Sequence, residues 1–149
     1  MAALAATALL VAPAGAAEAP TRAQYVSVAE SICKRNTAAN QRQLSAARRL
    51  IRKNRLKPAG RRLNRVARAL MVTVRQLARR PRPTEDAATL GRWIKQLKQQ
   101  ANYTRAISKA LLGGNRFRAS RLEVQRSRNA GQANRTVLVF GFRACRVRQ

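Results

Sequence analysis

The chain has 149 residues, 46% of them hydrophobic, and carries 32 Lys and Arg against 5 Asp and Glu, a formal net charge of +27. This length allows one domain, and the hydrophobic share excludes a purely disordered basic tail. With no histidine and two cysteines, the chain lacks the ligands of a closed zinc site and the imidazole base that a Ser or Cys nucleophile usually needs. The scattered acids Glu30, Glu85, Asp86 and Glu123 suggest surface ion pairs. The sequence therefore predicts no enzyme, no metal and no cofactor.

The N-terminal segment has the pattern of a secretory signal peptide. Residues 2–12 form an uncharged apolar run, and Pro13 and the small residues AGAA follow it before Glu18. This pattern predicts cleavage after Ala16 or Ala17, and the run is shorter than the roughly 20 apolar residues that span a bilayer. We therefore expect residues 1–17 to be removed, and residues 18–149 to form a single helical-bundle domain that is secreted or held in the cell envelope. No Lys or Arg precedes the run, which leaves open a start further upstream or a segment that is not a signal.

The first predicted helix begins at Thr21 and stops before Pro58. Thr21 and Gln24 have the spacing of a capping box, and apolar residues recur at intervals of three and four from Tyr25 onward.

The second predicted helix, residues 58–80, is amphipathic and has a basic outer face. Its apolar positions share one side, and arginines occupy the other. With four arginines near the preceding turn, they form the predicted polyanion-binding set: Arg48, Arg49, Arg52, Arg55, Arg61, Arg65, Arg68, Arg75 and Arg79. Arginine outnumbers lysine 26 to 6, and guanidinium groups suit phosphates. The codon usage of a GC-rich genome gives the same excess, however, and a basic face that serves only solubility is an equal alternative.

The third and fourth predicted helices are separated by Gly113-Gly114. Pro81 and Pro83 break the chain before the third helix, which starts at Thr84, and the two glycines end it. Asn115 caps the fourth helix, which Gly141 ends. Its predicted inward positions are Phe117, Ser120, Val124, Ser127, Gly131, Asn134 and Leu138. From their spacing we expect Trp93, Tyr25 and Phe117 in the core.

Short connections between long helices predict an all-α, antiparallel up-down four-helix bundle. Its fourth helix returns to the end where the first began, so residues 142–145 can run back along the first helix. Cys145 then comes within reach of Cys33, and an exported chain with an even number of cysteines is expected to pair them. The alternative is two reduced, buried thiols in a cytosolic protein.

Both ends of the chain resemble a family of small exported helical proteins of high-GC Gram-positive bacteria, a family without an assigned activity. Members of the family open with an aromatic residue and a helical turn of small residues, followed by Ile-Cys, a basic residue and Asn. Residues 25–40 of this chain, YVSVAESICKRNTAAN, have the same order. The family typically ends in a glycine, an apolar residue and a second cysteine, as Gly141, Phe142 and Cys145 do here. The resemblance implies a helical fold with a disulfide and no particular activity.

Two functions fit the excess of positive charge. The first is a non-catalytic protein, without a small-molecule substrate, that binds anionic envelope polymers or an anionic membrane surface through its arginine faces. The alternative is a cytosolic, histone-like protein that retains its N-terminus and binds nucleic acid through phosphates without reading sequence.

Overall fold

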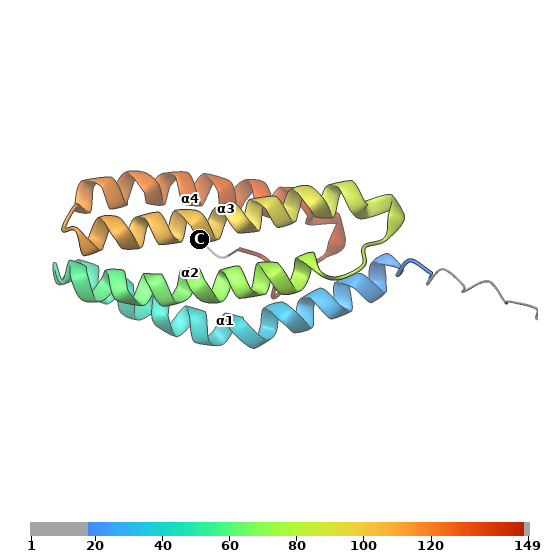
Figure 1. The fold of residues 1–149 in the computed structure, drawn as a ribbon, viewed down its shortest axis with the longest axis horizontal. Helices are drawn as coiled ribbons and strands as arrows, with labels where there is room; N and C mark the ends of the chain where they lie inside the picture. The colour runs from blue at the N-terminus through green and yellow to red at the C-terminus, as the bar shows by residue number, and fades with distance from the viewer. Residues whose placement is uncertain (1–17, 148–149) are drawn as a thin grey trace, which may run out of the picture.

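The computed structural model describes residues 18–147, and four long helices make up most of this part of the chain. Their bounds are α1 Arg22–Arg52, α2 Leu56–Ala78, α3 Ala87–Leu112 and α4 Arg116–Thr136. Short 3₁₀ turns precede α3 at Thr84–Asp86 and follow α4 at Leu138–Phe140. Successive helices run in opposite directions (Figure 1), and residues 18–147 contain no strand. The predicted up-down antiparallel four-helix bundle is confirmed.

Local capping signals set several helix ends. The Thr21 hydroxyl accepts a hydrogen bond from the Gln24 N–H at 3.3 Å, and the Gln24 side chain accepts one from the Thr21 N–H at 2.8 Å. The Asn115 side chain likewise accepts the Arg118 N–H at 2.8 Å. Helix α2 begins at Leu56, two residues before the expected start at Pro58. Proline is tolerated there because N–H groups in the first turn of a helix have no partner within it.

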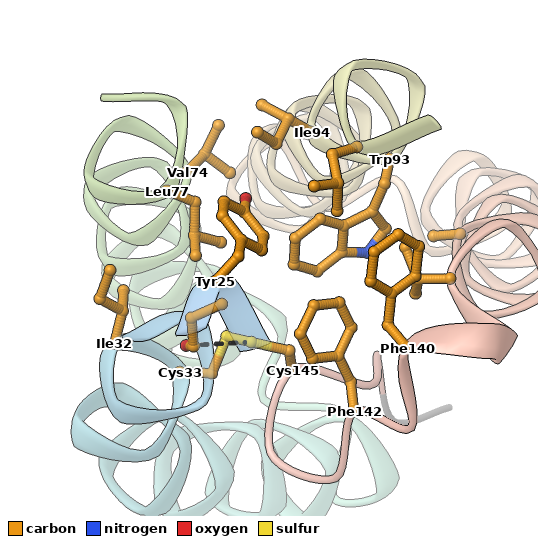
Figure 2. Packing of buried hydrophobic residues seen from close by; sticks show 14 residues of the cluster. Tyr25, Ile32, Cys33, Val74, Leu77, Trp93, Ile94, Phe140, Phe142 and Cys145 are labelled. Carbon is orange, nitrogen blue, oxygen red and sulfur yellow. Dashed lines mark hydrogen bonds between the residues drawn. A yellow bond between two sulfur atoms is a disulfide. The ribbon is translucent and has the colours of Figure 1, made fainter. Parts of the chain in front are cut away.

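The larger side chains of the core gather where α1 begins and α4 ends. Trp93 is fully buried, and its ring stacks on Phe142 with 4.9 Å between the ring centroids. Phe142 in turn stacks on Phe140 at 5.7 Å, and Tyr25 packs into the same cluster (Figure 2). The predicted core positions of Trp93 and Tyr25 are confirmed.

A second, thinner cluster fills the other half of the bundle and consists largely of alanine. Its buried members are Ala47, Ala59, Leu63, Ile107, Ala110, Leu111 and Ala119. Helices α2 and α3 approach closely here, and the Ser108 hydroxyl donates to the Gly60 carbonyl oxygen at 2.7 Å. A Cβ at Gly60 would lie 2.9 Å from both the Leu112 Cγ and the Ser108 carbonyl oxygen. Glycine at position 60 therefore permits this approach.

The predicted inward face of α4 is wrong. Phe117, Val124 and Leu138 are 75%, 51% and 70% exposed, so the expected core position of Phe117 is also wrong. The buried residues of the helix are Ala119, Arg126, Asn129, Ala130 and Ala133. Asn129 donates to the Gln96 carbonyl oxygen and to the Gln100 side chain, each at 2.9 Å. Alanines and hydrogen-bonded polar groups thus replace large apolar side chains at this face, and a hydrophobic pattern does not detect them.

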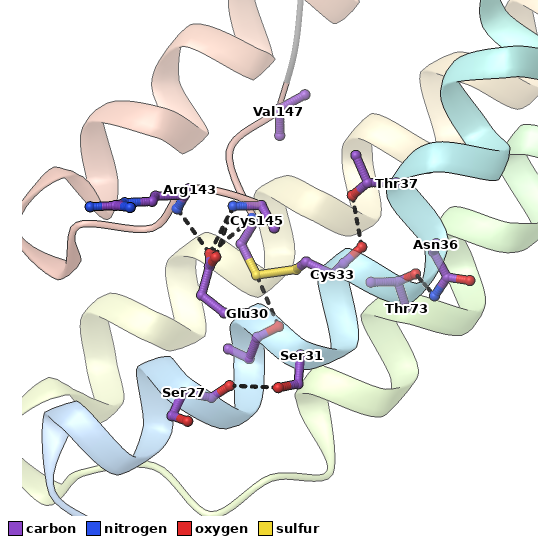
Figure 3. Close-up of a disulfide and its surroundings, with 12 residues drawn as sticks. Ser27, Glu30, Ser31, Cys33, Asn36, Thr37, Thr73, Arg143, Cys145 and Val147 are labelled. Atoms are coloured by element: carbon purple, nitrogen blue, oxygen red, sulfur yellow. Dashed lines mark hydrogen bonds between the residues drawn. A yellow bond between two sulfur atoms is a disulfide. The ribbon is translucent and has the colours of Figure 1, made fainter.

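The C-terminal tail lies in the gap between α1 and α4. Each helix packs against the next one along the chain, whereas α1 and α4 have hardly any direct contact. The tail enters this gap after Gly141, and Cys145 forms a disulfide with Cys33 of α1 (Figure 3). Both cysteines are buried. The predicted link between the first helix and the tail is confirmed.

Polar contacts hold the tail from both sides. The Glu30 carboxylate of α1 accepts the main-chain N–H groups of Arg143, Ala144 and Cys145 at 2.9 to 3.1 Å (Figure 3). Partial burial raises the pKa of Glu30, but the three N–H groups and the nearby charge of Lys34 together outweigh it, and the pKa lies below its ordinary value. On the other side, Asn134 of α4 exchanges two hydrogen bonds of 2.9 Å with the main chain at position 147. Glu30 therefore binds main-chain N–H groups, in place of the surface ion pair that the sequence suggests.

The predicted signal peptide, residues 1–17, lies outside the described residues. Within residues 18–147, no helix is both long enough and apolar enough to cross a membrane.

Candidate polyanion-binding surface

The outer face of α2 and its C-cap residue Arg79 carry a line of five arginines, which we call the arginine row: Arg61, Arg65, Arg68, Arg75 and Arg79. All five are exposed and lie opposite the buried positions of the helix, which include Leu63, Val66 and Leu77. At about 1.5 Å of rise per residue, the row is about 27 Å long. Val72, 47% exposed, occupies the position where one arginine is missing from the line. The row therefore presents closely spaced guanidinium groups along one straight edge.

The other four predicted arginines lie around the turn from α1 to α2. Arg48, Arg49, Arg52 and Arg55 are all exposed. Arg49 and Arg52 are in the last turn of α1, where a positive charge suits the negative end of the helix dipole. Arg55 is the N-cap of α2 and makes no capping hydrogen bond, and a cation at this position opposes the dipole. The turn therefore extends the positive surface beyond the N-terminus of α2.

Carboxylates do not neutralise this surface. Helix α2 contains no Asp or Glu, and the described residues contain two ion pairs, Arg22–Asp86 and Arg126–Glu123. Neither involves the nine predicted arginines. The hydrogen bond to Asp86 and the charge of Asp86 raise the pKa of Arg22. Within the row, Arg65 reaches the Gln43 side-chain oxygen at 3.5 Å, a neutral acceptor that leaves its charge in place.

A second, sparser basic strip follows the outer face of α3 and did not stand out in the sequence. Lys95, Lys98, Arg105 and Lys109 are exposed there. They fall at helical spacing, but polar and apolar residues separate them in the sequence without a clean amphipathic pattern. Three of the four are lysines, which bind phosphate as point charges and not through a bidentate fork. This strip provides a matched comparison for the arginine row.

Among residues 18–147, neither a cluster of metal ligands nor a Ser–Lys pair forms near these surfaces. Among residues 18–147, no three His, Cys, Asp or Glu side chains come together as metal ligands. The Ser108 hydroxyl is buried and bonded to Gly60, whereas the neighbouring Lys109 is exposed. The two side chains therefore do not form a nucleophile–base pair.

No protein-family model, curated protein or solved structure matches this chain. The family resemblance at the two ends of the sequence accordingly stays an expectation.

Proposed function

We propose that this protein is a non-catalytic binding module of the cell envelope that attaches to phosphate-bearing polyanions through the arginine row. The observation that carries the proposal is the line of five exposed arginines on a helix without a carboxylate. Guanidinium groups match phosphate oxygens in bidentate geometry. In the free protein, like charges four residues apart repel by a few tenths of a kcal/mol per pair. A bound polyanion relieves this repulsion at Arg61–Arg65 and Arg75–Arg79.

The disulfide supports a place outside the cytoplasm. Cys33 and Cys145 are paired and buried, and disulfides persist in oxidising compartments, whereas the cytosol keeps thiols reduced. The phosphodiester groups available there belong to anionic wall polymers and to lipid headgroups. Their shared chemistry, a repeated or clustered phosphate, is the proposed ligand.

The test compares two triple variants that lose the same charge. Arg61→Gln/Arg65→Gln/Arg68→Gln removes three of the five arginines of the row, and Lys95→Gln/Lys98→Gln/Arg105→Gln removes three cations from α3. Binding is measured from 50 to 300 mM NaCl against poly(glycerol phosphate), phosphatidylglycerol vesicles and duplex DNA. We expect the row variant to bind at least 10-fold more weakly and to show a flatter salt dependence, by about one unit of slope per lost phosphate contact. Equal losses in both variants would show that net charge alone drives binding, and would refute the role of the row.

The N-terminus and the location of the protein in its own host distinguish the envelope proposal from the nucleic-acid alternative. The envelope proposal expects a mature protein that begins near residue 18 and fractionates with the envelope or the medium. N-terminal sequencing of the protein from medium, envelope and cytosol checks this. An intact N-terminus in the cytosol, together with tighter binding to DNA than to the other two probes, would favour the histone-like function instead.

A further inference from the structure

A groove remains between α1 and α4 at the end of the bundle away from Trp93. The tail lines it on one side, where residues 144–147 border a cavity of about 130 Å³. A second cavity of about 320 Å³ continues from there toward the α1–α2 and α3–α4 turns. The two cavities share Leu44, Thr104 and Arg126 as lining residues. The tail thus closes one part of the gap between α1 and α4, and the rest stays open.

The floor of the larger cavity is apolar. Its lining includes Leu44 and Ile51 of α1, Leu63 of α2, and Ile107 and Leu111 of α3. Leu63, Ile107 and Leu111 are buried and belong to the alanine-rich cluster. Between Arg116 and Glu123, helix α4 lines the space only with the small side chains of Ala119 and Ser120.

Positive charge flanks this apolar floor. Arg48 of α1 and Arg116 of α4 line the cavity from its two sides, and both are exposed. The one carboxylate in the lining, Glu123, accepts two hydrogen bonds from Arg126. The negative charge inside the groove is therefore paired, whereas neither cation at its mouth takes part in an ion pair among the described residues.

The dimensions match one hydrocarbon chain. Along α4 the cavity extends from Arg116 to Arg126, about 15 Å at the helical rise of about 1.5 Å per residue. The hydrocarbon core of a bilayer is about 30 Å thick and holds two acyl chains end to end, so one chain needs about 15 Å. An apolar trough of this length with cations at its mouth has the two features that an anionic amphiphile requires.

We propose that the groove between α1 and α4 binds the acyl chain of an anionic amphiphile, with Arg48 and Arg116 holding its carboxylate or phosphate head. Leu44, Leu63, Ile107 and Leu111 contact the chain, and the paired Arg126–Glu123 closes the inner end. This proposal does not rest on the arginine row. The residues of the row line neither cavity.

Binding is tested on the oxidised full chain with cis-parinaric acid, a fatty acid whose fluorescence rises in an apolar site. We expect saturable binding of one molecule per chain. Ser120 is exposed and lines the cavity, so Ser120→Trp fills the groove without disturbing the core. Gln125→Trp is the matched control, because Gln125 is exposed on α4 and lines neither cavity. We expect at least 10-fold weaker binding for Ser120→Trp and no change for Gln125→Trp. Absence of saturable binding, or equal effects of the two variants, overturns the proposal.

A second pair of variants tests the head-group contact. Because the probe is itself a fatty acid, each inhibition constant is corrected for the affinity of the probe for that variant. Arg48→Gln/Arg116→Gln should then raise the inhibition constants of palmitate and hexadecyl phosphate at least 10-fold, and should leave that of hexadecanol unchanged. Lys95→Gln/Lys98→Gln loses the same charge on α3 and should change none of these. The ratio of the affinities for palmitate and for hexadecyl phosphate distinguishes a fatty acid from a phospholipid as the source of the head. If Arg48→Gln/Arg116→Gln affects hexadecanol as strongly as the anions, the two arginines do not hold the head. Because Arg61→Gln/Arg65→Gln/Arg68→Gln leaves the groove intact, it should bind parinaric acid normally even if polyanion binding is lost.

Discussion

Replacing Gly60 with alanine tests the close packing of α2 on α3. In an exposed helix interior, alanine is more stable than glycine by about 1 kcal/mol. At position 60 the added Cβ would lie 2.9 Å from the Ser108 carbonyl oxygen and 3.1 Å from the Leu112 nitrogen. Both are main-chain atoms of α3, so they cannot move aside without a shift of the whole helix. We therefore expect Gly60→Ala to destabilise the protein, although alanine by itself favours the helix.

The net effect follows from three contributions. Overpacking of a tight interface costs about 1 to 3 kcal/mol. Separation of the helices also lengthens the 2.7 Å hydrogen bond from Ser108 to the Gly60 carbonyl oxygen, a bond worth about 1 kcal/mol. After subtraction of the gain of about 1 kcal/mol in helix propensity, we expect Gly60→Ala to lower the free energy of unfolding by about 1 to 3 kcal/mol.

Gly91→Ala is the matched control inside α3. A Cβ at Gly91 would meet the end of the Arg82 side chain at 3.3 Å, and this flexible group can turn away. We therefore expect Gly91→Ala to raise the free energy of unfolding by up to about 1 kcal/mol. Urea denaturation of the oxidised proteins, followed by far-UV circular dichroism, measures both changes. If Gly60→Ala were as stable as Gly91→Ala, the close approach of α2 and α3 at Gly60 would be refuted.

Three further predictions concern the tail. Cys33→Ser/Cys145→Ser opens a loop with a sequence separation of 112 and should lower the free energy of unfolding by about 5 kcal/mol in the chain-entropy model; equal urea midpoints for the oxidised and reduced wild type would contradict this. Glu30→Ala removes the acceptor of three N–H groups and should cost about 1 to 3 kcal/mol. Because the folded pKa of Glu30 lies below its ordinary value, this contribution is complete above the unfolded pKa of about 4.3 and is lost as the pH falls through the folded pKa. The gap in urea midpoint between wild type and Glu30→Ala should therefore close in acid, and a gap that is independent of pH would exclude this role. Phe142→Ala should cost about 3 to 5 kcal/mol, because this tail residue is 3% exposed, and it should alter the fluorescence of Trp93; a loss below 1 kcal/mol would show that the tail is not part of the core.

The features that could be predicted from the sequence depend on residues close together in the chain. The capping box of Thr21 and Gln24 and the Asn115 cap involve groups three residues apart, so their geometry follows once the helix forms. The large apolar residues of α2 recur at helical spacing and therefore share one buried face. The arginines between them necessarily lie on the opposite, outer face. The fourth helix has no such period, and two of its large apolar residues, Phe117 and Val124, point to solvent.

The sequence by itself determined four helices, their antiparallel order and a basic face on the second, because periodicity and capping do not depend on distant packing. It also limited any disulfide within the chain to Cys33 and Cys145, because no other cysteine is present. Only the tertiary structure decided what lies between α1 and α4. There the tail takes up part of the gap through Glu30, Asn134 and Phe142, and a groove with Arg48 and Arg116 at its mouth occupies the rest. The contacts of Glu30 join residues more than a hundred positions apart, and their donors are main-chain N–H groups, which leave no pattern in the sequence. The groove is a space that no side chain fills, and it leaves no pattern either.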